Sequence, residues 1–275
     1  MNDLRVLGIH GVGNLQPSLA PGPAARRIAD WWLKALAKRL GSTALTVEMA
    51  YYAHLLSSAE NLPQGEEELD LLPQWAQDDA LIWGRLLGAG DDIAQGRLSA
   101  PLRALVDWIA RTYGLDHRLA RMFIVLFFAE VNAYFTDSDR RGAAVTEVAD
   151  ALERVEPRVV VAHSLGSVVA YEALWTSPHP EIELFLTLGS PLAMPDVVYD
   201  RLLPHEGARR LPPGVARWIN IADPGDIVAV PRGGIAAGFQ QVTADITDGI
   251  GAFDFHRATK YLACAATAGV LAAHM

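Results

Sequence analysis

The chain has 275 residues, of which 51% are hydrophobic, and it carries a formal net charge of -9 at pH 7. This length allows one large α/β domain with a sizeable core, and the acidic charge argues against a nucleic-acid partner, whose phosphates need basic residues. The single cysteine, Cys264, excludes a disulfide within the chain, which suits a reducing compartment. The first residues lack the pattern of a signal peptide, so we expect a cytoplasmic protein.

The first elements follow the order strand, loop, helix, strand. Residues 4–9 form an apolar strand candidate that runs into His10-Gly11-Val12-Gly13-Asn14. Residues 24–40 have the apolar spacing of a helix, and residues 44–52 are a second strand candidate. This order is typical of a parallel sheet. The glycine pair fits either an ordinary turn or a loop whose N–H groups approach a ligand.

The stretch from about residue 53 to residue 142 contains helix candidates and no evident strand. It begins with an acidic segment at 63–70, which could be a turn or a short helix, and continues with helix candidates at 74–87, 102–113 and 119–135. Such a length exceeds a simple crossover, so we expect a helical cap inserted over the edge of the sheet. The run 122–129 is apolar all round but too short to span a bilayer. It is either a buried helix or a lid that contacts a membrane surface transiently.

The chain is organised around the segment 158–170. Its β-branched run predicts a strand buried on both faces, which stops at Ser164 and is followed at once by a helix. Such a sharp turn needs small residues two positions away, and Ala162 and Gly166 supply them. The turn would raise the Ser164 hydroxyl above the sheet at a helix N-terminus, where a nucleophile belongs.

Polar residues follow the later strand candidates. We expect strands at 182–188 and 215–221, a last short strand near 240–243, and a final helix at 257–271. Asp223 and Asp226 follow the strand candidate at 215–221, and His256 follows the last strand candidate. Because the carboxyl ends of parallel strands share one edge, these side chains could meet Ser164 there. A serine needs a histidine base, and the base needs a carboxylate.

Four motifs carry a resemblance to a known family. Ala162-His163-Ser164-Leu165-Gly166 resembles the nucleophile elbow of the α/β-hydrolase superfamily, and Ile9-His10-Gly11-Val12-Gly13 is similar to the oxyanion motif of lipases and esterases. Leu188-Gly189-Ser190-Pro191 and Asp226-Ile227-Val228 resemble two further lipase motifs. The cap matches no family that we can name.

The resemblance implies a fold and a set of site residues. The fold would be one α/β-hydrolase domain over residues 1–275, with a mostly parallel sheet of about six strands flanked by helices. The catalytic residues would be Ser164, Asp226 and His256, with Asp223 as the rival acid. The backbone N–H groups of Val12 and Leu165 would form the oxyanion hole.

The expected function is that of a serine hydrolase cleaving carboxylic esters, with a small acyl ester or lipid as substrate. Thioesterase, amidase and acyltransferase activities remain alternatives that use the same triad. A catalytically silent fold used for binding or scaffolding is a further alternative. The sequence contains no motif for a metal or a nucleotide, so we expect no cofactor.

Overall fold

Six parallel strands form one sheet in the computed structural model, in the order β2-β1-β3-β4-β5-β6. The structure describes residues 4–41, 45–57, 68–90, 100–178, 182–205, 209–251 and 256–275. The strands are β1 (Leu4–Ile9), β2 (Leu45–Ala50), β3 (Val159–His163), β4 (Leu184–Leu188), β5 (Trp218–Ala222) and β6 (Ala244–Thr247). Because all six run in the same direction, their carboxyl ends share one edge, where the loops after the strands emerge.

The central strands are apolar on both faces because helices cover both faces. Every residue of β3 and of β4 is buried. Alternate residues along β3 enter different cores: Val160 packs with one cluster of buried side chains, and Val159 and Val161 pack with another. This period of two explains why an unbroken run of valines makes a strand at the centre of an α/β sheet.

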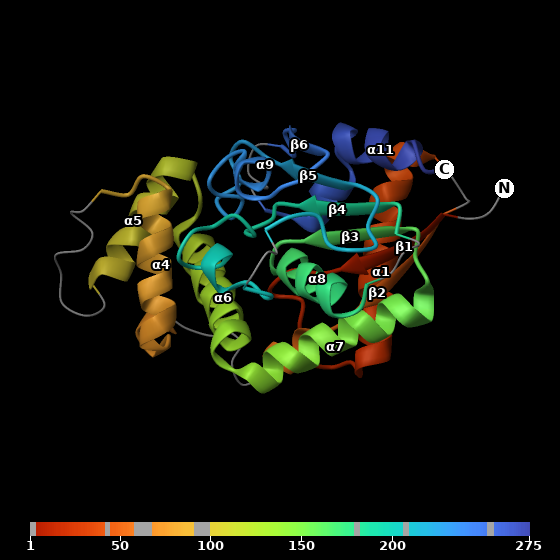
Figure 1. Ribbon diagram of the computed structural model, residues 1–275. Helices are drawn as coiled ribbons and strands as arrows, with labels where there is room; N and C mark the ends of the chain where they lie inside the picture. Colours follow the sequence, from red (N-terminus) through yellow and green to blue (C-terminus); the bar gives the residue numbers. More distant parts are fainter. Residues whose placement is uncertain are drawn as a thin grey trace.

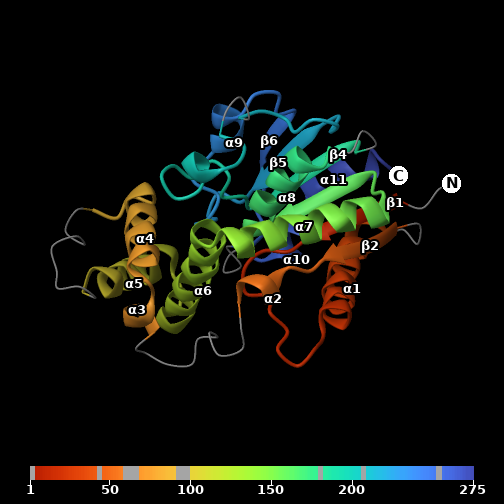
Figure 2. The same cartoon turned by 60° about the horizontal axis from the view of Figure 1, so that its bottom comes forward.

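Two groups of helices form the outer layers. Helices α7 and α8 pack on one face of the sheet, and α1, α10 and α11 lie together on the other (Figures 1 and 2). The helices of these layers are α1 (Pro21–Leu40), α7 (Ser138–Val155), α8 (Leu165–Thr176), α10 (Ala258–Leu262) and α11 (Ala265–Ala272). Helix α1 ends at Gly41, whose left-handed backbone (φ 60°) closes the helix with a bond to Ala37.

A long helical insertion separates β2 from α7. It contains α2 (Ala53–Leu56), α3 (Glu68–Leu71), α4 (Gln74–Leu86), α5 (Ala100–Tyr113) and α6 (His117–Thr136). Figure 1 shows α4 to α6 beyond the edge toward which the strands run. Their buried side chains belong to the same apolar cluster as Leu7, Ile9 and Val160 of the sheet. The described residues of the insertion include no strand.

Helix α6 is the most apolar of the three long helices of the insertion. It is long and apolar enough, by length and composition, to span a bilayer, but the core helix of a soluble protein passes the same test. Ile124, Phe127, Phe128 and Val131 are fully buried in the apolar cluster. These contacts favour the buried-helix interpretation of residues 122–129 over a helix that faces lipid.

The structure confirms the predicted sheet of about six parallel strands flanked by helices and corrects two elements within it. The last strand is Ala244–Thr247, and not 240–243, because Gln241 adopts a left-handed backbone (φ 64°) that interrupts an extended chain there. The predicted final helix is two helices, because the extended Cys264 caps the second one through a bond from Thr267 N–H to its sulfur.

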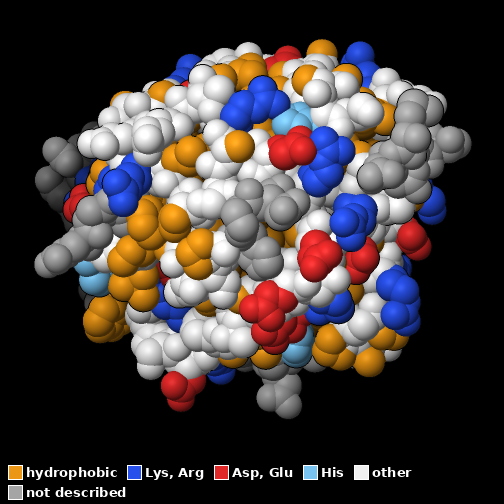
Figure 3. Space-filling view, turned by 45° about the vertical axis from the view of Figure 1, so that its right-hand side comes forward, with side chains coloured by type: hydrophobic (Ala, Val, Ile, Leu, Met, Phe, Trp, Pro, Cys, Tyr) orange, Lys and Arg blue, Asp and Glu red, His pale blue; other side chains and the backbone are white. Residues whose placement is uncertain are grey.

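One face of the molecule carries side chains of both charges. On the face drawn in Figure 3, acidic and basic side chains lie close together among apolar ones. Opposite charges at such short range largely cancel at a distance.

Candidate functional site

Ser164 occupies a sharp turn between β3 and α8. Its backbone angles, φ 54° and ψ -133°, are strained for a residue with a side chain. The Ser164 N–H donates to the Leu188 carbonyl of β4 at 3.0 Å, which ties the turn to the neighbouring strand. A Cβ at position 166 would lie 2.3 Å from the His10 carbonyl oxygen and 2.6 Å from that of Ile9. Only glycine therefore allows α8 to start so close to β1.

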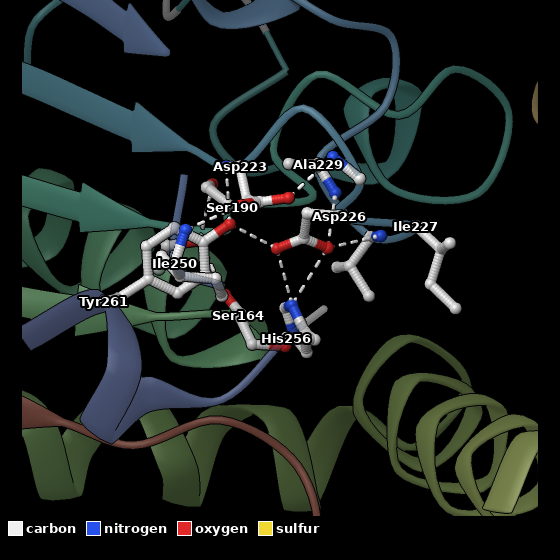
Figure 4. Close-up of polar contacts among 12 residues, drawn as sticks. Ser164, Ser190, Asp223, Asp226, Ile227, Ala229, Ile250, His256 and Tyr261 are labelled. Atoms are coloured by element: carbon white, nitrogen blue, oxygen red, sulfur yellow. Dashed lines mark hydrogen bonds and ion pairs between the residues drawn. The ribbon is translucent and has the colours of Figure 1, made fainter. Parts of the chain in front are cut away.

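His256 and Asp226 form a hydrogen-bonded pair at the same edge of the sheet. The His256 Nδ1 lies 2.8 Å and 3.0 Å from the two carboxylate oxygens (Figure 4). The pair is largely buried, with 6% of the His256 side chain and none of the Asp226 side chain exposed. This contact assigns the proton of a neutral imidazole to Nδ1, which leaves Nε2 free to accept a proton.

Two further groups hold the Asp226 carboxylate in place. The Val228 N–H donates to Oδ1 at 2.7 Å, and the Tyr261 hydroxyl donates to Oδ2 at 2.6 Å. The burial of Tyr261 and the charge of Asp226 raise the pKa of this phenol far above its usual range, so it remains a donor. Tyr261 is a site residue that the sequence reasoning missed.

Asp223 has a different role from Asp226. Its carboxylate accepts hydrogen bonds from Gly225 N–H at 2.6 Å and from Ile250 N–H at 2.7 Å. Its own N–H donates to the Tyr261 hydroxyl at 2.8 Å. Asp223 therefore closes the turn after β5, and the carboxylate that His256 contacts is that of Asp226.

The Ser164 Oγ and the His256 Nε2 are both buried. Among the described residues, the Ser164 Oγ and the His256 Nε2 have no hydrogen-bond partner, including each other. Such a bond often forms or tightens only when substrate binds. Gly189, at the end of β4, packs against the pair: a Cβ there would lie 2.6 Å from Asp226 Oδ2 and 3.1 Å from His256 Cε1.

The loop of residues 10–14 lies directly against Ser164. A Cβ on Gly11 would lie 2.6 Å from the Cβ of Ser164. The ring of His10 supports this loop. The Tyr52 N–H donates to the Nε2 of His10 at 3.3 Å, which places the proton of the neutral ring on Nδ1. The Nδ1 of His10 therefore donates to the Gly11 carbonyl at 2.9 Å. Burial lowers the pKa of His10 to about 4, which keeps the ring neutral.

Asn14 orients two successive peptide units of this loop. Its amide donates to the Gly11 carbonyl at 3.0 Å and to the Val12 carbonyl at 3.1 Å. The C=O and N–H of a trans peptide point in opposite directions, so the Val12 N–H points away from the side chain of Asn14. This leaves the Val12 N–H unused by the two side chains that hold the loop.

His163 precedes Ser164 in the chain, and its ring centroid lies 4.6 Å from that of His256. Burial, and to a lesser extent the proximity of His256, lowers the pKa of His163 well below its usual range. His163 is therefore a neutral neighbour of the His256–Asp226 pair.

The helical insertion touches the residues around this pair. Phe123 of α6 lies 5.9 Å from the His256 ring, centroid to centroid, at a steep angle. The fully buried Trp83 of α4 donates its indole N–H to the Ile227 carbonyl at 2.5 Å. Trp75, by contrast, is 66% exposed and lies outside this cluster.

Comparisons of the chain with models of known protein families, with curated proteins and with solved structures find no match. The interpretation of the site therefore depends on its own geometry. Within the described ranges, no three His, Cys, Asp or Glu side chains gather in a group that could hold a metal ion.

Proposed function

We propose that the protein is a serine hydrolase that cleaves carboxylic esters and has an α/β-hydrolase fold with the helical insertion as its cap. One observation carries the proposal: the His256–Asp226 pair is buried at the carboxyl edge of the sheet, where Ser164 adopts a left-handed backbone between β3 and α8. A hydroxyl (Ser164), a carboxylate (Asp226) and an imidazole (His256), in this order along the chain, are the parts of a hydrolase triad.

The proposed reaction has two halves. The Ser164 Oγ attacks the acyl carbon while His256 Nε2 takes its proton, and Asp226 stabilises the imidazolium. His256 then returns the proton to the leaving alcohol, and an acyl-enzyme remains. Water, deprotonated by His256, attacks the acyl carbon, and His256 gives that proton to the departing Ser164 Oγ as the acid is released. The N–H groups of Val12 and Leu165 bind the oxyanion in both halves, each contributing about 3 to 4 kcal/mol at the transition state.

The surroundings of the pair favour an apolar acyl group. The side chains of α6 nearest the site include Phe123 against His256 and Leu126, which lies 3.7 Å from the Cβ position of Gly13. An acyl ester or lipid would place its chain against this side, where burial of each CH₂ contributes about 0.8 kcal/mol. We expect turnover of p-nitrophenyl esters to change with chain length, and a flat profile from acetyl to long chains would contradict this assignment.

A fluorophosphonate probe tests the nucleophile. The probe should label Ser164 of the wild-type protein, and Ser164→Ala should abolish both labelling and ester turnover while the far-UV spectrum is retained. Ser167→Ala is the matched control, because this nearby buried hydroxyl is already engaged with the Ser164 carbonyl at 2.6 Å and with Ser190 at 2.7 Å. Persistent labelling of Ser164→Ala would refute the assignment, and absence of labelling in the wild-type protein would favour a catalytically silent fold.

A further inference from the structure

Glu130 of α6 is a buried carboxylate that the proposed triad does not use. It is only 2% exposed, although it follows a run of apolar residues in the most apolar of the three long helices of the insertion. Its Oε1 accepts a hydrogen bond from the N–H of Gly13 at 3.0 Å. A buried carboxylate that bonds to the loop beside the nucleophile can affect the geometry of that loop.

With the hydrogen bond from the Gly13 N–H, both polar groups of one peptide unit are held. The unit between Val12 and Gly13 has its carbonyl held by Asn14 at 3.1 Å and its N–H held by Glu130. The preceding unit has its carbonyl held by His10 and Asn14. Val12 thus lies between two peptide planes of fixed orientation, and Glu130 supplies the contact from outside the loop.

We infer that Glu130 is a positioning residue that keeps the N–H of Val12 aimed at the oxyanion by holding the adjacent peptide unit through Gly13. This inference rests on the proposed function, because the Val12 N–H matters only if an oxyanion forms there. It also makes α6 part of the catalytic apparatus, since a shift of this helix would move the oxyanion loop with it.

The strength of this contact depends on the charge of Glu130. Burial raises the pKa of Glu130 to about 7, although hydrogen bonds from Gly13 N–H and the Ser57 side chain act in the opposite direction. A hydrogen bond to an ionised carboxylate is roughly twice as strong as one to a neutral group. The hold on Gly13 should therefore weaken as the pH falls through about 7.

The tyrosines and histidines around Glu130 have pKa values that are shifted away from 7. The pKa values of Tyr51 and Tyr52 are raised, mainly by burial, so both phenols stay neutral near pH 7. His10 has a pKa of about 4, and burial lowers the pKa of His54, which stacks on Tyr51. Three charged side chains of α4 and α7 are engaged in ion pairs: Asp79 with Arg201, Arg141 with Glu172, and Arg140 with Asp137.

The kinetic test compares Glu130→Gln and Glu130→Ala with the wild-type enzyme between pH 5.5 and pH 8.5. The glutamine can still accept from Gly13 but is never charged, so it imitates protonated Glu130 at every pH. At pH 8.5 we expect kcat of the wild type to exceed that of Glu130→Gln about tenfold with KM nearly unchanged, less than the 100- to 1000-fold effect of losing an oxyanion donor. The ratio should approach one at pH 5.5, and Glu130→Ala should be slower than Glu130→Gln.

Asp79→Asn is the matched control. It weakens another buried contact of the insertion, the ion pair with Arg201 at 2.6 Å and 2.7 Å, but it does not touch the loop of residues 10–14. Its kcat should follow the wild-type pH profile. A ratio of wild type to Glu130→Gln that does not change with pH, or a similar kcat loss in Asp79→Asn, would overturn the inference.

A spectroscopic measurement separates this inference from the proposed function. Val12-Gly13 is the only Val-Gly pair in the sequence, so carbonyl-¹³C valine and ¹⁵N glycine labelling isolates the Gly13 amide. Its resonance should titrate near pH 7 in the wild type and not in Glu130→Gln, and a resonance that does not titrate would overturn the inference. If the probe fails to label wild-type Ser164, the proposed function fails, even where Gly13 titrates.

Discussion

Replacing Gly166 by alanine should destabilise the protein strongly, although alanine is the better helix former. The new Cβ would lie 2.3 Å from the His10 carbonyl oxygen, 2.6 Å from the Ile9 carbonyl oxygen and 2.9 Å from the His10 carbonyl carbon. All three are backbone atoms at the end of β1, which is paired on both sides, with β2 and β3. β1 cannot move away without breaking its ladders, so α8 must shift instead.

The expected size of the effect follows from two opposing contributions. Overpacking costs about 1 to 3 kcal/mol, and the contact with fixed backbone places Gly166→Ala at the upper end of that range. The higher helix propensity of alanine offsets about 1 kcal/mol of this destabilisation. We therefore expect a net loss of about 2 kcal/mol, which lowers Tm by about 4 °C in a chain of this size. Ester turnover should fall too, because His10 begins the oxyanion loop.

Urea unfolding followed by circular dichroism measures this loss, with Gly142→Ala as the control. Gly142 is an exposed residue within α7 whose Cβ position has no neighbour within 4 Å, so alanine should stabilise the protein there by about 0.5 to 1 kcal/mol. The two identical substitutions should thus have opposite signs. A Gly166→Ala protein as stable as Gly142→Ala would refute the claim that close approach of α8 to β1 requires glycine.

Three further substitutions test the buried carboxylates and their partners. Asp226→Asn should lower kcat by about 10³- to 10⁴-fold with little change in fold, because an amide no longer holds the productive tautomer of His256. Steady-state kinetics measures the loss of kcat, and circular dichroism checks the fold. A loss under tenfold would contradict the triad. Tyr261→Phe should reduce the free energy of unfolding by about 1 to 3 kcal/mol, because the buried Asp226 carboxylate loses a donor; an unchanged urea midpoint would contradict this. For Glu130→Gln, the folded-state pKa of about 7 lies above the ordinary 4.5, so the folded protein holds a proton that the unfolded chain releases. The free energy of unfolding of the wild type, relative to that of Glu130→Gln, should then be greatest below pH 4.5 and fall by about 3 kcal/mol as the pH rises through 7. A difference that stays constant with pH would show that Glu130 is not buried in this way.

The apolar strands are predictable because consecutive apolar residues indicate a strand that is buried on both faces. Every residue of β3 and every residue of β1 except Arg5 is buried, because helices cover both faces of the sheet there. β6 is different: its four residues are only partly buried or exposed, so a short edge strand there has no comparable signal. The break within the predicted final helix has no sequence signal for a similar reason, since the extended backbone at Cys264 depends on a local cap and not on hydrophobic spacing.

The side chains of the candidate site that could be predicted, those of Ser164, Asp226 and His256, all come after a strand and before the next helix. Ser164 and Asp226 lie just after β3 and β5, and the parallel sheet brings such positions to one edge. Tyr261 and Glu130 lie within helices α10 and α6. Whether a polar group of a helix reaches the site depends on how that helix packs against the sheet. Their positions in the sequence carry no such signal, because a tyrosine and a glutamate at those places fit ordinary helices equally well.

The energetics of Glu130 argue that its place in α6 serves more than packing. Removing a carboxylate from water is unfavourable, and the raised pKa of Glu130 shows that the bonds from Gly13 and Ser57 do not offset this. An uncharged side chain would make the fold more stable at neutral pH. Residues that lower stability while contacting a reactive centre are expected where geometry at that centre matters more than the stability of the fold. The contact of Glu130 with the loop beside Ser164 has this character, since α6 could pack on the sheet without any charge at this position.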